Sequence, residues 1–357
     1  MRSGTAVREA LLNVVSGTSR AVGSALLLLI VTLGLTGLDL AAVRQLDTQA
    51  QNFVNSGASI STLSAPGRID GALCEALNGV AGVRAAGALR KVADLHPSHL
   101  PNTSVPVYEV TPGLAKVVLR DEPVGPLGLV VSAEAAETLG VAKGGSIATA
   151  TGDALVAGVY PYPEDGRVKA FSYAALSRVP AEGRFDECWV DHWPVAAQVA
   201  PLLRNVMAPG TADDPGAVLS GQLNDRLGRT VDAHGWFSSR LTAWAPVATG
   251  LAGWALGFAA VRGRRLELTS ALHVGVGRLA LQGMLLAESA VWTLPTLLAG
   301  GAVSAAFARI GLPGDGTANL ILGLFPVLSG VLGALLGVQT AGLSLREERL
   351  FDHFKQR

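Results

Sequence analysis

The glycine-rich run at residues 140–146 comes nearest to a phosphate-binding loop. Such a loop needs the spacing GxxxxGK followed by Ser or Thr, because its lysine must reach the terminal phosphates of the nucleotide. Here Lys143 precedes Gly144 and Gly145, so the lysine stands at the wrong position. The sequence therefore does not predict ATP binding by this route.

Four other side chains are of types that bind metals or act in catalysis. His96 and His99 are separated by two residues, but one of these, Pro97, breaks the helix that would align them on one zinc ion. Cys188 and His192 could share one helix face, although the neighbouring tryptophans indicate ordinary packing. The motifs GxSxG and HExxH are absent as well. We expect no catalytic residue and no metal site.

The two cysteines, Cys74 and Cys188, both lie in the polar segment at residues 44–240. If this segment is outside the cell, an oxidising compartment permits a disulfide between them. The alternative is two buried free thiols. Both interpretations stay open, because the sequence does not show the geometry that a disulfide requires.

The composition is that of a membrane protein. Apolar residues make up 49% of the chain and charged residues 16%, against about 25% charged in ordinary soluble domains. The net charge is zero and there is no basic stripe, which excludes a nucleic-acid-binding surface. Stretches with almost no charge, each long enough to cross a bilayer as a helix, occur at residues 21–43, 241–261, 281–308 and 318–343.

The segment at residues 44–240 has the pattern of a folded domain with its own core. Short β-like runs separated by turn residues occur at 105–110, 127–132, 146–149 and 155–160. Helical patterns occur at 69–77, 133–139 and 194–206. The predicted fold is therefore four transmembrane helices with a large extracytoplasmic α+β domain inserted between the first and the second.

The distribution of basic residues predicts the orientation in the membrane. Arginines and lysines gather at residues 1–20, in the loop at 262–280 and in the tail at 344–357, while the short turn at 309–317 carries only Arg309. By the positive-inside rule, both termini and the 262–280 loop are cytoplasmic. The pattern at residues 1–20 indicates an amphipathic helix on the inner face of the membrane. The alternative is that residues 1–38 form a signal peptide.

Two sets of short motifs resemble the FtsX/MacB-like family of ABC transporter permeases. In the cytoplasmic loop, residues 264–268 read RRLEL, residues 271–278 read ALHVGVGR, and residues 285–289 read LLAES. In the outer segment, the matching runs are GLVVS at 128–132, AETLGV at 136–141, KGGS at 143–146 and VAGVY at 156–160. Gly145 stands where the family usually has Asp.

The resemblance implies a bacterial plasma (inner) membrane protein that is not itself an enzyme. A separate ABC ATPase chain would bind ATP and Mg²⁺, and a second permease chain, identical or different, would complete the assembly. ATP hydrolysis would move the outer domain (mechanotransmission), with export or extraction of an unknown substrate. The alternative is a signalling or regulatory membrane protein. Its outer domain would control a cell-wall hydrolase, which is then its extracytoplasmic partner, or would sense an extracellular ligand.

The cytoplasmic loop is the predicted contact with the ATPase. Its helix–glycine–helix pattern could lie in a groove of a soluble partner, or could merely touch lipid headgroups. The resemblance implies an ATPase-coupling element made of Arg264, Arg265, Glu267, Leu268, Leu272, Val274, Gly275, Gly277 and Arg278.

Three features of the apolar stretches remain. Gly253 with Gly257, and Gly333 with Gly337, form GxxxG spacings that allow helices to approach closely, unless they are incidental in a glycine-rich chain. Glu288 is expected to reach the cytoplasmic interface rather than to form a salt bridge with Arg278, because ten residues of helix separate the two.

Overall fold

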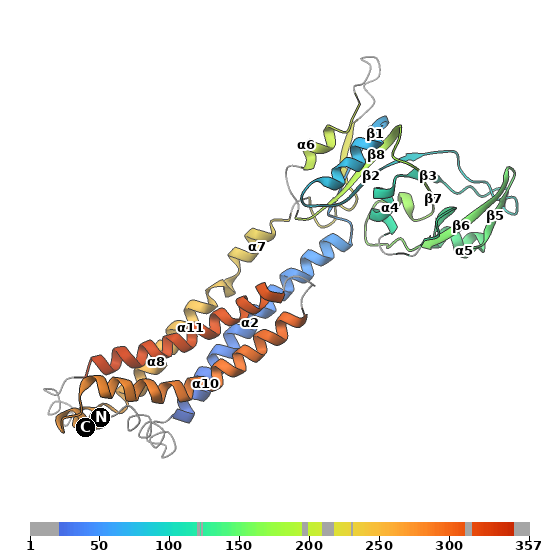
Figure 1. Cartoon of the computed structure of the whole chain (residues 1–357). Coiled ribbons are helices and arrows are strands. Elements are labelled where there is room, and N and C mark those ends of the chain that lie inside the picture. Colours follow the sequence, from blue (N-terminus) through green and yellow to red (C-terminus); the bar gives the residue numbers. More distant parts are fainter. Residues whose placement is uncertain are drawn as a thin grey trace. The chain divides into compact units, whose positions relative to one another are not determined.

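Figure 1 shows the computed structural model of the chain. It describes residues 21–119, 122, 124–194, 199–208, 218–229, 231–310 and 316–345. The chain divides into two compact units: a helical unit (Met1–Asp47 with His234–Arg357) and a sheet unit (Thr48–Ala233). The helix predicted at residues 1–20, most of the predicted 309–317 turn and nearly all of the 344–357 tail lie outside the described residues.

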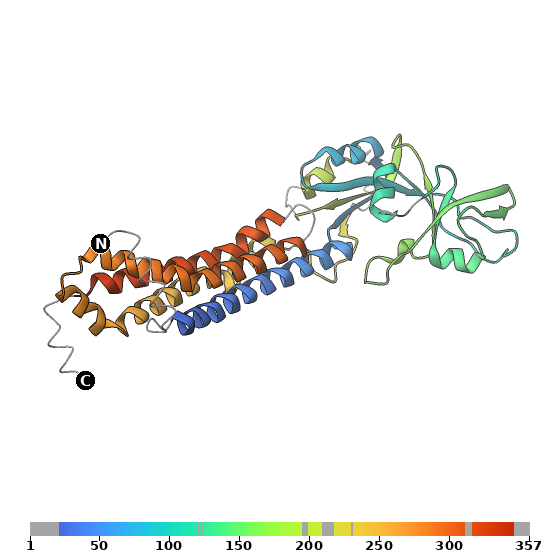
Figure 2. The same ribbon diagram turned by 60° about the horizontal axis from the view of Figure 1, so that its bottom comes forward.

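Four described helices are long and apolar enough to cross a membrane. In chain order they are α2 (Ala21–Asn55), the 3-10 turn η3 (Leu241–Trp244) running into α8 (Ala245–Arg262), α10 (Arg278–Ile310) and α11 (Gly316–Leu343). The helices α8, α10 and α11 begin and end close to the predicted stretches. Helix α2 continues to Asn55, well past residue 43. The apolar pattern ends before the helix does, because the residues after 43 are largely polar. Figure 2 shows the four helices running alongside one another.

Helices α8 and α11 approach each other backbone to backbone at the predicted GxxxG positions. A Cβ atom at Gly253 or Gly257 would lie 2.1 Å from a carbonyl oxygen of α11. A Cβ atom at Gly333 or Gly337 would lie 2.1 or 2.0 Å from a carbonyl oxygen of α8. The two motifs therefore pack against each other within one chain.

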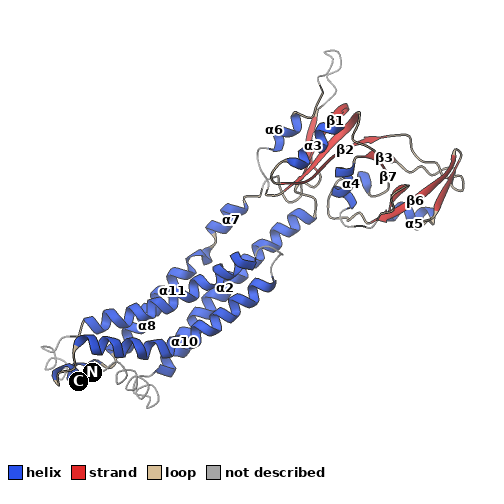
Figure 3. Ribbon diagram, viewed as in Figure 1, coloured by secondary structure: helices blue, strands red, loops and turns tan. Residues whose placement is uncertain are grey.

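The sheet unit is built on one mixed sheet, in which the described residues form nine strands in the order β5-β6-β4-β7-β3-β2-β8-β1-β9. The pairs β3–β7 and β4–β6 are parallel and the other neighbours are antiparallel. Figure 3 shows the strands in red. Their bounds are β1 (Ile60–Asp70), β2 (Val83–Lys91), β3 (Val107–Val110), β4 (Leu129–Ser132), β5 (Ser146–Thr149), β6 (Gly152–Tyr160), β7 (Ala175–Arg178), β8 (Arg184–His192) and β9 (Leu219–Gln222).

Short helices cover the sheet. They are α3 (Gly71–Ala76), η1 (Leu77–Gly79), α4 (Pro112–Leu119), α5 (Ala133–Leu139), η2 (Lys169–Phe171) and α6 (Val199–Arg204), with α7 (Ala233–Ser239) following. Successive residues of β8 enter different cores: Cys188 and Val190 lie in one buried cluster and Trp189 in the other. Both faces of the central sheet are therefore covered, as a strand's alternating side chains require.

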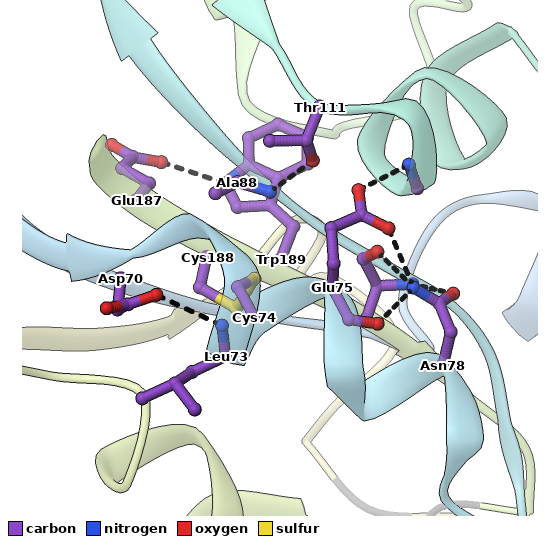
Figure 4. The surroundings of a disulfide bond; sticks show 12 residues. Asp70, Leu73, Cys74, Glu75, Asn78, Ala88, Thr111, Glu187, Cys188 and Trp189 are labelled. Atoms are coloured by element: carbon purple, nitrogen blue, oxygen red, sulfur yellow. Dashed lines mark hydrogen bonds between the residues drawn. A yellow bond between two sulfur atoms is a disulfide. The ribbon is translucent and has the colours of Figure 1, made fainter. Parts of the chain in front are cut away.

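A disulfide joins Cys74 of α3 to Cys188 of β8, with their Cα atoms 6.0 Å apart (Figure 4). Asp70 begins α3 by accepting hydrogen bonds from two backbone N–H groups of its first turn. Glu75, the next residue after the cysteine, accepts a hydrogen bond of 2.6 Å from the backbone N–H of Gly113 in α4. The disulfide and this carboxylate hold α3 between β8 and α4.

Candidate functional site

The predicted coupling loop folds as a short helix followed by a sharp stop. Helix α9 (Arg265–His273) lies between α8 and α10. Gly275 has a φ of 95°, and its N–H donates to the carbonyl of Leu272 while the N–H of Val276 donates to that of Ala271. These two bonds form a Schellman motif, in which the left-handed residue is nearly always glycine. We call the segment from Arg264 to Leu279 the elbow.

The elbow has an inner and an outer side. Leu268 and Leu272 are buried in one cluster with Leu281 and Leu285 of α10. At the tip, Val274 is 85% exposed and Leu279, in the first turn of α10, is 90% exposed. The remaining exposed residues of the predicted set are Glu267, Gly275, Gly277 and Arg278, and Arg265 is half-buried. The predicted set is thus divided between a supporting core and an exposed tip with apolar side chains.

Arg264 links the start of α9 to the interior of α10. Its Nη1 lies 2.5 Å from Oε1 of Glu288, and its Nε and Nη2 donate to the two oxygens of Glu267 at 3.0 and 2.7 Å. The Arg264 and Glu288 side chains are only 10% and 5% exposed, whereas that of Glu267 is 53% exposed. The expectation that Glu288 reaches the interface was wrong. It is paired inside the helical unit instead.

The electrostatics of this pair follow from its burial. Loss of water disfavours the charged guanidinium, but the hydrogen bonds that Arg264 donates to Glu267 and the charge of Glu288 outweigh that loss and raise the pKa of Arg264 above its ordinary value. A cavity of about 20 Å³ beside the pair is lined by residues that include Ser289 and Trp292. It is large enough for one water molecule.

The structure gives some of the other residues considered for chemistry a structural role, and it assigns no role to the rest. Gly140 ends α5 in the left-handed conformation, and Gly144 has a φ of 84° in the turn before β5. His96 and His99 are exposed. Cys188 and His192 lie on a strand, so the idea of a shared helix face was wrong. Within the described ranges, no three His, Cys, Asp or Glu side chains are placed to hold a metal ion.

Together these features define the class of protein: a membrane protein with four long apolar helices and an α+β sheet unit. Part of the chain is similar to two solved structures. One is the periplasmic region of MacB from Actinobacillus actinomycetemcomitans, with 12% identity over 42% of this chain and 81% of that one and a TM-score of 0.30. The other is the extracellular domain of the noncanonic ABC-type transporter YknZ from Gram-positive bacteria, with 14% identity over 40% and 88% and a TM-score of 0.28. No family model and no curated protein sequence matches the chain.

Proposed function

We propose that the chain is the permease subunit of an FtsX/MacB-type ABC transporter. A separate ATPase chain, which binds ATP and Mg²⁺, docks on the elbow, and a second permease chain completes the assembly. The observation that carries the proposal is the elbow tip, where Val274 and Leu279 are exposed at the end of a stopped helix with its own buried core. The motif resemblance at residues 264–289 supports it.

The form of the elbow favours a protein partner over a lipid surface. Contact with anionic headgroups requires basic side chains but no folded support. The elbow has such support, because Leu268 and Leu272 are buried and the Schellman motif fixes the end of α9. A rigid helix end with exposed apolar side chains is suited to a groove in a soluble protein. The arginines of the elbow then help to place it on the cytoplasmic side.

The sheet unit lies on the opposite side of the membrane in this proposal. The Cys74–Cys188 disulfide supports that location, because structural disulfides persist mainly outside the cytoplasm. The chain passes between its two units twice, at Asp47–Thr48 and at Ala233–His234. Movement of α2, or of the segment that leads into η3, is therefore conveyed to the sheet unit through covalent bonds. This connectivity supports the proposal of mechanotransmission for export or extraction of an unknown substrate.

Co-purification tests the proposal. The chain is isolated in mild detergent and the accompanying proteins are identified by mass spectrometry. We expect an ABC ATPase, and we expect Val274→Asp or deletion of residues 266–276 to abolish its recovery, because either change removes the exposed apolar side chain of Val274 from the tip. The matched control is Leu127→Asp, which places the same charge on an exposed leucine of the sheet unit. An ATPase yield unchanged by the elbow variants would refute the docking site.

A further inference from the structure

We propose that the Arg264–Glu288 ion pair ties the elbow to the body of α10, so that displacement of the elbow tip moves α10 as well. Arg264 and Glu288 are then positioning residues. The tie itself is a property of this chain alone. Its use in transmitting force rests on the proposed function.

The tie matters because the turn of the elbow contains two glycines, Gly275 and Gly277. A Cβ atom added at Gly275 or Gly277 would meet nothing within 4 Å, so these two positions have no side-chain packing, whereas Val276 between them packs against the buried cluster. Glycine also permits more backbone conformations than any other residue. A push on the tip would be absorbed by bending at this turn if α9 and α10 were joined nowhere else.

Two kinds of contact join α9 to α10 beyond the turn. Leucines 268, 272, 281 and 285 share one buried cluster, whose hydrophobic contacts have little directional preference. The Arg264–Glu288 hydrogen bond is directional and charge-assisted. Glu288 lies ten residues into α10, about 15 Å along its axis at the helical rise per residue. The ion pair therefore fixes the base of the elbow to a point well inside α10.

Burial makes this pair hard to open. Separation would leave two largely buried charges with room for about one water molecule beside them, and unpaired charges in such a place are costly. The bond from Arg264 to Glu267 lacks this property, since its carboxylate is largely exposed and water can replace the guanidinium. Arg264 thus has a buried partner, Glu288, and an exposed partner, Glu267. Substituting each glutamate in turn compares a buried with an exposed ion pair of the same arginine.

The first experiment follows hydrogen exchange of the α9 amides in the full chain in lipid nanodiscs. Glu288→Gln is expected to speed exchange at Leu268–Leu272 by tenfold or more. Glu267→Gln makes the same chemical change in the other partner of Arg264 and is expected to alter the exchange rate less than threefold. Equal effects of the two substitutions would overturn the tie. This measurement needs no ATPase, so it remains decisive if the proposed function fails.

The second experiment separates transmission from folding. Because a buried ion pair can often be replaced by apolar side chains without loss of stability, Arg264→Met with Glu288→Met serves as a folded variant if Glu288→Gln does not fold. We expect it to keep the thermal stability of the wild type, but to speed α9 exchange at least fivefold and to lower permease-stimulated ATP hydrolysis, measured per ATPase bound, at least fivefold. If the α9 amides of this folded variant exchange at the wild-type rate, the tie is refuted. Faster exchange with unchanged stimulation would overturn the transmitting role alone.

Discussion

Asp39 in α2 and Arg240, just before η3, form a buried ion pair although they are 201 positions apart in the sequence. The Arg240 Nε lies 2.9 Å from Asp39 Oδ1, and the two side chains are 11% and 2% exposed. The guanidinium also lies over the ring of Phe237, 3.9 Å from its centroid. This pair holds the start of η3 against α2.

Loss of one member of this pair is expected to weaken the helical unit. Asp39→Asn leaves a buried guanidinium without its counter-charge, which typically costs about 3–5 kcal/mol. Thermal unfolding in detergent measures the change. Glu267→Gln is the control, because loss of an exposed ion pair typically costs less than about 1 kcal/mol. Similar melting temperatures for the two variants would contradict the structural role of Asp39.

The contact between α8 and α11 predicts that a single methyl group is not tolerated at Gly257. A Cβ atom there would lie 2.1 Å from the carbonyl oxygen of Ala334, so Gly257→Ala must push the helices apart. We expect a loss of about 1–3 kcal/mol, the usual effect of overpacking. Thermal stability and gel-filtration behaviour in detergent provide the measurement.

Gly283→Ala is the matched control for that substitution. Gly283 is also inside a membrane-length helix, but a Cβ atom there meets nothing within 4 Å. Alanine is the better helix former by about 1 kcal/mol in soluble hosts, so this variant should be as stable as the wild type or more so. If both variants behave alike, the α8–α11 packing is not as described.

The disulfide is expected to stabilise the sheet unit strongly. Cys74 and Cys188 are separated by 114 residues, and a crosslink across such a long loop is worth roughly 4–5 kcal/mol in the chain-entropy model. Cys74→Ala with Cys188→Ala should therefore lower the urea midpoint of the sheet unit. Under denaturing conditions, a maleimide-polyethylene glycol reagent should modify the wild type only after reduction. Modification of both cysteines without reductant would contradict the bridge.

The orientation of the chain can be tested with single added cysteines. Val274→Cys on the elbow and Leu127→Cys on the sheet unit both introduce a thiol at a well-exposed position. In intact cells a membrane-impermeant maleimide should label the Leu127→Cys variant and spare the Val274→Cys variant until the cells are opened. The reverse pattern would contradict the positive-inside assignment.

His192 makes the sheet unit sensitive to acid. Burial is the main cause that lowers the pKa of His192 below the ordinary histidine value of about 6.5, against the opposing charge of Asp191. Its ring also lies 2.9 Å from the Ser61 hydroxyl. The unfolded chain therefore binds a proton at His192 more readily than the folded chain does. The contribution of neutral, buried His192 to the stability of the sheet unit is complete above about pH 6.5 and is lost as the pH falls below that value.

Urea midpoints between pH 5 and 8 measure this dependence. In His192→Gln, which cannot titrate, the decrease below about pH 6.5 should be smaller than in the wild type. An identical pH dependence in the two proteins would exclude His192 as its source. The other titratable groups of the sheet unit are the same in both proteins.

The sequence alone predicted the long helices and part of the sheet unit. Apolar stretches of membrane-spanning length indicate helices without any knowledge of their neighbours. Strands β3 to β6 were predicted because turn residues separate short β-like runs. Strand β2 was missed, because Ala85–Leu89 are buried without a break and show no alternation. Helices on both faces of a sheet remove the pattern by which strands are usually recognised.

The partners of charged and small residues were decided only by the tertiary structure. Glu288 is conspicuous in an apolar stretch, but its partner Arg264 precedes it by 24 positions and meets it only because the chain turns back after α9. In the same way, the glycines of α8 are matched to those of α11 by helix packing. Hydrophobic length is a local property of the chain, whereas pairing depends on where the turns bring distant residues together.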